Sequence, residues 1–261
     1  MAQLLCILVS FLASAAGCIC GIGGGVIIKP VLDALGLYSV AAISFMSGGI
    51  VLAMTAYTVL GTVLAHESVI EKRVSTWLGL GAALGGLAGK QLFDLFREGV
   101  GGGDLIGAVQ AALLFAVTLG TAAYTVCRAR IRPRRMVRPV GCVLTGLGLG
   151  MVSAFLGIGG GPIHLVVLQF FFSMETKRAA QNSLYIILLS QLASLLFTVA
   201  AGRVPDFPAP LFACMVGCGI LGGMIGRRIH RRIAAKTVDR LFLGLLAVIM
   251  GICAYNVFRY A

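Results

Sequence analysis

The sequence Gly-Ile-Gly-Gly-Gly occurs twice, at residues 21–25 and 157–161, and each copy directly follows a run of apolar residues. Glycine is a weak helix former, so such a cluster interrupts a helix that would otherwise continue. A shorter apolar run follows each copy, "VIIKPVLDAL" at 26–35 and "PIHLVVLQFFF" at 162–172. Each GIGGG therefore predicts a turn between two helices.

The composition of the chain predicts a membrane protein. Of its 261 residues, 59% are hydrophobic and only 11% are charged. The apolar runs reach the roughly 20 residues that a helix needs to cross a bilayer. Because little sequence remains outside these runs for a separate water-soluble core, we expect an all-α polytopic membrane protein with one membrane domain, residues 1–261.

The chain is internally duplicated, since further blocks recur at offsets of 131 to 138 residues, a sign of repeat architecture. We predict a first repeat at about 1–128, a basic linker at 128–138 and a second repeat at about 139–261. A weak match places Ser44 opposite Asn182. The matched blocks are "AAISF" (41–45) with "AAQNS" (179–183), "LGGLAGKQL" (84–92) with "LGGMIGRRI" (221–229), and "GTAAYTVCR" (120–128) with "GICAYNVFR" (251–259).

Each half holds three ordinary apolar spans besides its glycine-broken unit. If that unit crosses the membrane once, eight spans result, and the basic segments 128–138 and 227–240 lie on opposite faces, which carry 10 and 11 basic residues. If it is instead a re-entrant hairpin, both basic segments lie on one face. The expected spans are 40–65, 75–96, 105–127, 179–201, 208–229 and 241–258.

Charge asymmetry favours the hairpin interpretation. It assigns 16 Lys and Arg residues to inner segments and four, Lys90, Arg97, Arg203 and Arg259, to outer ones. An excess of positive charge marks the cytoplasmic side. We therefore expect cytoplasmic basic segments, both termini outside, and two inverted repeats, each a hairpin plus three transmembrane helices, an architecture typical of secondary transporters.

The net charge of +12 does not indicate nucleic acid, because neither basic segment interleaves aromatic residues with its charges. Such segments beside apolar spans are anchors that contact anionic lipid headgroups. The eight cysteines show no CxxC spacing and lie in or at the ends of apolar runs, so we expect packing residues and neither a metal nor a cofactor. No catalytic motif is present to predict an enzyme.

The GIGGG turns are the expected substrate site. A turn at membrane depth is tolerated only where protein or a water-filled cavity satisfies its backbone groups, and the helix that begins after each turn points its positive end there, which suits an anion. Other glycines, at four-residue spacings, are expected to pack helices together: Gly81, Gly85 and Gly89, and Gly222 with Gly226. The candidate site glycines are Gly21, Gly23, Gly24, Gly25, Gly157, Gly159, Gly160 and Gly161.

Four side chains join these glycines as candidates. Lys29 either neutralises the bound anion, as a cation within the membrane suggests, or extends to the surface. His164 either binds the anion or a proton, or packs as a buried residue. Ser44 and Asn182 either donate hydrogen bonds to the anion or bridge helices.

The duplicated GIGGG, with Pro30 five residues beyond the first copy, a chain of this length and a basic central segment together resemble the TauE/SafE family of sulfite and organosulfonate exporters. The second copy departs from the first, since Pro162 comes early and Val166 stands where Pro30 would fall. The resemblance implies transport of a small sulfur-containing anion. An uptake permease for another small anion, or a non-transporting membrane scaffold, remains an alternative, and a homo-oligomer is compatible with either.

Overall fold

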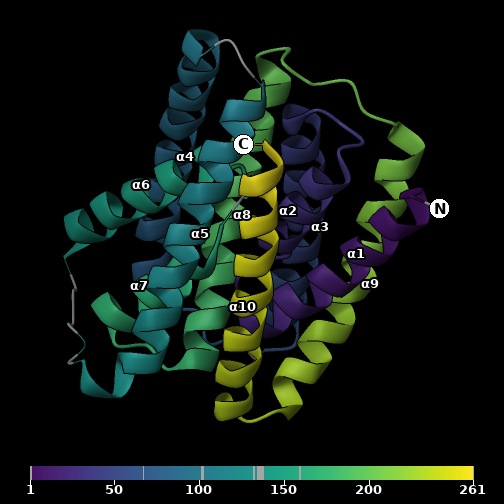
Figure 1. Cartoon of the computed structure of the whole chain (residues 1–261). Helices are drawn as coiled ribbons and strands as arrows, with labels where there is room; N and C mark the ends of the chain where they lie inside the picture. Colours follow the sequence, from purple (N-terminus) through teal and green to yellow (C-terminus); the bar gives the residue numbers. More distant parts are fainter. Residues whose placement is uncertain are drawn as a thin grey trace.

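The computed structural model describes residues 2–66, 68–100, 103–131, 133, 138–158 and 160–260. Helices joined by turns and loops make up this part of the chain, and it contains no strand (Figure 1). The predicted all-α fold is confirmed. The first half contains α1 (Ala2–Cys20), α2 (Gly25–Leu35), α3 (Val40–Leu64), α4 (Lys72–Val100), α5 (Gly103–Cys127) and the short 3-10 helix η1 (Arg128–Arg130). The second half contains α6 (Pro139–Phe155), α7 (Pro162–Phe172), α8 (Thr176–Ala200), α9 (Ala209–Arg232) and α10 (Ala235–Tyr260).

Within the described residues, six helices are long and apolar enough to cross a membrane: α1, α3, α5, α8, α9 and α10. The chain is therefore a multi-pass membrane protein. The expected span 75–96 lies inside α4, which is not one of the six, whereas α1 has the length to cross by itself. By contrast, α2 and α7 have 11 residues each, or roughly 16 Å at the rise of an α-helix, too short to cross.

Helices of the first half pack against helices of the second half, and these pairs are matched. Helix α4 packs along α6 on one side of the molecule, and α1 packs along α9 on the other (Figure 1). Two further pairs, α4 with α8 and α5 with α7, have their counterparts in α9 with α3 and α10 with α2. If each helix of the first half corresponds to the one five places later, each of these four pairs is matched, as a duplicated chain predicts.

Glycines bring the backbones of these outer pairs together. A Cβ atom on Gly85 would collide with the carbonyl group of Leu147 on α6, and one on Gly222 would collide with the carbonyl oxygen of Phe11 on α1. Gly81 and Gly89 make the same approach to α6, and Gly226 to α1. The predicted packing role of these small residues is confirmed.

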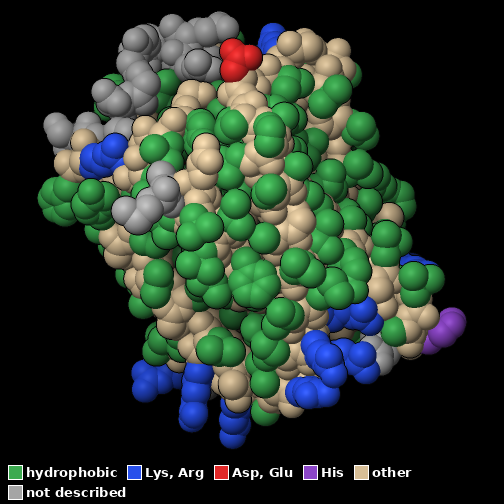
Figure 2. Space-filling view, turned by 90° about the vertical axis from the view of Figure 1, so that its right-hand side faces the viewer, with side chains coloured by type: hydrophobic (Ala, Val, Ile, Leu, Met, Phe, Trp, Pro, Cys, Tyr) green, Lys and Arg blue, Asp and Glu red, His purple; other side chains and the backbone are tan. Residues whose placement is uncertain are grey.

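The two basic segments lie at the same end of the molecule. Arg128, from the first segment, donates a hydrogen bond to Thr176 Oγ1 (2.9 Å), which donates to Asp239 in the second (2.8 Å). At the opposite end, Arg259 donates to the backbone carbonyl of Asp33 (3.0 Å). Figure 2 shows Lys and Arg gathered along the lower edge, below a broad apolar surface. The hairpin interpretation predicts that the basic segments share one end, whereas eight crossings would separate them; the re-entrant hairpins themselves stay a prediction.

Candidate functional site

Both GIGGG motifs form turns that need glycine. In the first, Gly21 and Gly23 adopt left-handed backbone angles (φ 75° and 72°), and in the second Gly157 does so (φ 64°). A side chain would strain the backbone there. The amide of the isoleucine in each copy donates to a carbonyl five residues earlier, Ile22 to Gly17 (3.0 Å) and Ile158 to Ser153 (3.2 Å). Gly159 lies outside the described residues.

The two turns make reciprocal contacts with the long helices of the opposite half. A Cβ atom on Gly21 would collide with Ala180 of α8, and one on Gly157 would lie 2.6 Å from Ser44 Oγ of α3. The two glycines are 136 residues apart, as are Ser44 and Ala180. The starts of the two 25-residue helices, Val40 and Thr176, differ by the same offset. Ser44 therefore corresponds to Ala180, and its match with Asn182 was wrong by two residues.

The turns also meet each other. A Cβ atom on Gly25, the first residue of α2, would collide with the carbonyl oxygen of Ile158 in the second turn and would lie 3.1 Å from Ser47 Oγ. Helix α7 begins at Pro162, directly after Gly161. The N-termini of the two short helices therefore start from turns that touch. Among the described candidate glycines, Gly24 packs on α1 at Ser14, and Gly160 lies against Ile187 of α8.

A cavity of about 650 Å³ lies beside the second turn, between α3, α4, α6 and α8. Ser44 and Gly157, both predicted site residues, line it. Arg203 and Pro205, which follow the C-terminus of α8, line it together with Phe93. No Asp or Glu is among its described lining residues. The polar side chains of the wall are Ser44, Lys90, Gln110, Ser153, Ser190, Gln191, Ser194, Thr198 and Arg203.

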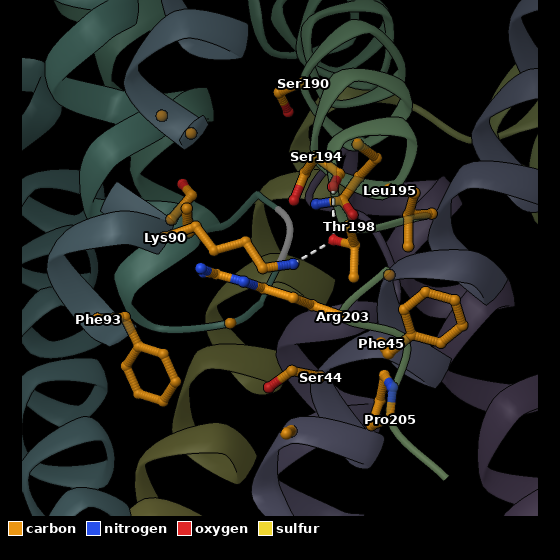
Figure 3. Close-up of a pocket in the computed structure, with 18 of the residues that line it drawn as sticks. Ser44, Phe45, Lys90, Phe93, Ser190, Ser194, Leu195, Thr198, Arg203 and Pro205 are labelled. Atoms are coloured by element: carbon orange, nitrogen blue, oxygen red, sulfur yellow. Dashed lines mark hydrogen bonds between the residues drawn. The ribbon is translucent and has the colours of Figure 1, made fainter. Parts of the chain in front are cut away.

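Two cations reach into this cavity. Lys90 extends from α4 and donates a short hydrogen bond to Thr198 Oγ1 on α8, and Arg203 extends from the loop after α8 to lie beside it, above Ser44 (Figure 3). In the sequence both count as charges of outer segments, and neither was predicted as a site residue. One signal was available, because the matched blocks align Lys90 with another cation, Arg227.

Lys29 lies one step behind the cavity wall. Its side chain is only 4% exposed, its Nζ donates to Gln110 Oε1 (2.6 Å), and it pairs with Asp33 at 3.6 Å. Gln110 in turn donates to the carbonyl oxygen of Phe155 (2.6 Å) and lines the cavity. Lys29 therefore extends neither to the surface nor into the cavity, and Gln110 connects it to the wall.

The structure does not bring the other two predicted side chains to this cavity. His164 on α7 is fully buried, and neither ring nitrogen has a hydrogen-bond partner among the described residues. Asn182 is also buried and bonds to Ser75, the amide of Glu71 and the carbonyls of Val69 and Arg178. It ties α8 to the start of α4.

Comparison with known proteins assigns the chain to a transporter family. The family described as "Sulfite exporter TauE/SafE" matches residues 6–252. The chain is 24% identical to the "Probable membrane transporter protein YunE" of Bacillus subtilis, with 96% of each chain covered. It is 23% identical over 73% of its length to the "Probable membrane transporter protein MamO" of Magnetospirillum gryphiswaldense, of which it spans 32%. No solved structure shows a significant match. With nearly all of its length matched and a multi-pass helical fold, the chain is a membrane transporter that belongs to the TauE/SafE family.

Proposed function

We propose that this protein exports a small sulfur-containing oxyanion, sulfite or a small organosulfonate, through the main cavity. The observation that carries the proposal is the pair Lys90 and Arg203 in a cavity whose other described polar groups are neutral. Charged side chains inside a membrane protein are costly and mark substrate pathways. A pathway lined by cations, hydroxyls and amides, without a carboxylate in its described wall, selects anions.

The donor set suits an oxygen-rich anion. A guanidinium offers a planar fork that can bind two oxygens of one group, and an ammonium provides a compact positive charge. Serine and threonine hydroxyls donate to further oxygens. A cavity of about 650 Å³ equals the volume of roughly twenty water molecules in the liquid. The anion therefore enters partly hydrated and exchanges its water for these donors as it moves through the cavity.

The proposed site extends to the turns, beside the N-termini of α2 and α7. Gly157 and Ser44 line the cavity there, and Gly25 touches the second turn. Glycine allows a ligand to approach the backbone closely, and the positive ends of the two short helices attract negative charge. Behind this wall Lys29 bonds to Gln110, and His164 lies on α7 next to Gly160.

The charge distribution supports export. With the basic end in the cytoplasm and in contact with anionic lipid headgroups, the main cavity opens to the outside, where an exported anion is released. A negative-inside potential then drives each negative charge outward with about 2.3 kcal/mol per 100 mV.

The test is efflux of radiolabelled sulfite and methanesulfonate from proteoliposomes, at zero and at inside-negative potential. Lys90→Gln and Arg203→Gln should each raise the KM at least about tenfold, because a hydrogen bond to a charged group contributes about 1.5–3 kcal/mol. Lys236→Gln and Arg240→Gln, which remove the same charges from exposed positions at the basic end, are the matched controls and should leave KM unchanged.

Different outcomes separate the alternatives. Flux of phosphate or chloride with none of sulfite or methanesulfonate would indicate a permease for another anion. No flux of any anion through a folded protein would favour a membrane scaffold. Equal KM values for the cavity variants and their controls would remove the cavity from the pathway.

A further inference from the structure

A second cavity lies at the opposite, basic end of the molecule. Its volume is about 180 Å³, against about 650 Å³ for the main cavity. It lies between α1, α3, α8 and α9, which correspond by order in the two halves to the four helices around the main cavity. Its lining residues are Cys18, Thr58, Thr62, Ala180, Gln181, Leu184, Arg227, His230 and Arg231.

The residues of the second cavity stand at the positions that line the main one. Ala180, Gln181 and Leu184 of α8 are each 136 residues beyond Ser44, Phe45 and Gly48 of α3. The remaining matches follow the same offset or one residue more: Thr58 with Ser194, Thr62 with Thr198, Cys18 with Ala154, Arg227 with Lys90 and His230 with Phe93. Of the nine lining residues, only Arg231 lacks a counterpart in the main cavity's described wall.

The cations of the two cavities also make equivalent bonds. Lys90, from the first half, donates to Thr198 near the end of α8 in the second half. Arg227, from the second half, donates to the carbonyl oxygen of Gly61 near the end of α3 in the first half, at 2.6 Å. Gly61 precedes Thr62, the counterpart of Thr198. Each cation therefore joins the two halves at the wall of its own cavity.

We propose that the second cavity is the inner half of the anion pathway, captured in its contracted form, and that Arg227 binds the anion there as Lys90 does in the outer half. The inference rests on the proposed function and extends it to a site of its own. When the two halves exchange conformations, as duplicated transporters do, the inner cavity expands and the outer one contracts. The anion then passes from Arg227, past the turns, to Lys90 and Arg203.

Cysteine accessibility tests this pathway without requiring a substrate. The anionic reagent 2-sulfonatoethyl methanethiosulfonate is itself a small sulfonate and forms a mixed disulfide with a reactive thiol. Cys18 lines the inner cavity, and Ala154→Cys places a thiol at the matching position of the outer one. Exposed Cys127, next to Arg128, reports whether the reagent reaches the basic end. Mass spectrometry of labelled peptides distinguishes the three.

In vesicles whose Cys127 reacts, Cys18 should react faster than the cysteine at position 154. In vesicles of the opposite orientation the cysteine at position 154 should react faster than Cys18. A Cys18 that stays unmodified from both sides, while the cysteine at position 154 reacts fully, would overturn the inference.

A second measurement concerns the charge at position 227. Arg227→Gln should lower sulfite efflux at least about tenfold, the lower end of the effect of one charge-assisted hydrogen bond. Arg227→Lys, which installs the residue found at position 90, should retain most of the flux even if the Gln variant does not fold. Arg240→Gln is the control for charge at the basic end.

Different results would disprove the proposed function and the inner anion site. A wild-type protein that carries no sulfur anion overturns the proposed function, whatever the labelling shows. A wild-type protein that carries sulfite, with Cys18 unreactive and folded Arg227→Gln as active as Arg240→Gln, leaves the proposed function in place and overturns the inner site.

Discussion

The backbone of Gly25 lies so close to the carbonyl oxygen of Ile158 that a Cβ atom at position 25 would collide with it. The two residues belong to the two GIGGG motifs. Their contact brings together the turn before α2 and the turn before α7. Because even one methyl group is too large, this contact makes glycine necessary for a packing reason that is separate from backbone angle.

Gly25→Ala should therefore destabilise the protein. The added methyl group forces the turns apart, and overpacking of this kind costs about 1–3 kcal/mol. Gly244→Ala is the matched control, because a Cβ at this position of α10 meets nothing within 4 Å, and in a helix alanine is the better helix former. Thermal melting in detergent should show a lower Tm for Gly25→Ala and an equal or higher Tm for Gly244→Ala. Equal melting of both variants would contradict the close contact.

Removal of Lys29 should affect stability more than anion affinity. Lys29 forms a buried pair with Asp33 and bonds to Gln110, while Gln110 and not Lys29 lines the cavity. Breaking a buried pair by removing one partner costs about 3–5 kcal/mol, and replacing both partners with apolar residues is often close to neutral.

A double-mutant cycle measures this effect. Lys29→Met should lower the Tm strongly, and Lys29→Met combined with Asp33→Leu should recover most of the loss. The sulfite KM of the double variant should stay within a few-fold of wild type. A folded Lys29→Met with unchanged Tm and a strongly raised KM would instead place the ammonium in direct contact with the anion.

Alanine substitutions of Ser44 and Asn182 should distinguish a residue that binds the anion from one that stabilises the fold. Ser44 lines the main cavity at Gly157, so Ser44→Ala should raise the KM for sulfite several-fold and leave the Tm unchanged. Asn182 makes four hydrogen bonds, one within α8 to Arg178 and three that hold α8 to the start of α4 at Val69, Glu71 and Ser75. Asn182→Ala leaves buried groups without partners, which costs about 1–3 kcal/mol for each such group. Its Tm should fall while the KM of the folded fraction stays the same, and the opposite pattern would exchange the two roles.

Both termini should lie outside the cell, opposite the basic segments. The 16 basic residues of the inner segments against four in the outer ones favour this orientation. Alkaline phosphatase fused at the N-terminus and at the C-terminus should be active in both fusions, since the enzyme needs the oxidising exterior to form its disulfides. A fusion inserted after Lys236 should be inactive. An active N-terminal fusion with an inactive C-terminal one would exclude the re-entrant hairpins.

Several features were predictable because they follow from order along the chain. The length of the apolar runs set the membrane class, the glycine clusters placed the turns before α2 and α7, and the four-residue spacing of Gly81, Gly85 and Gly89 identified a helix-packing face. Each depends on local composition or a fixed period, which a sequence displays directly.

The site depended on rotation about helix axes, which the sequence does not display. A match in error by two residues turns a side chain by roughly 200° around its helix. The residue of α8 that corresponds to Ser44 is therefore Ala180, and Asn182 instead faces the start of α4. In the sequence Lys90 and Arg203 are charges of outer segments. The packing of α4 against α6 and α8 directs Lys90 into the cavity, and the loop after α8 brings Arg203 there. The sequence by itself determined a duplicated membrane fold broken at two glycine turns. Only the tertiary structure decided which cations face the space between the halves, because that depends on how separate helices pack against one another.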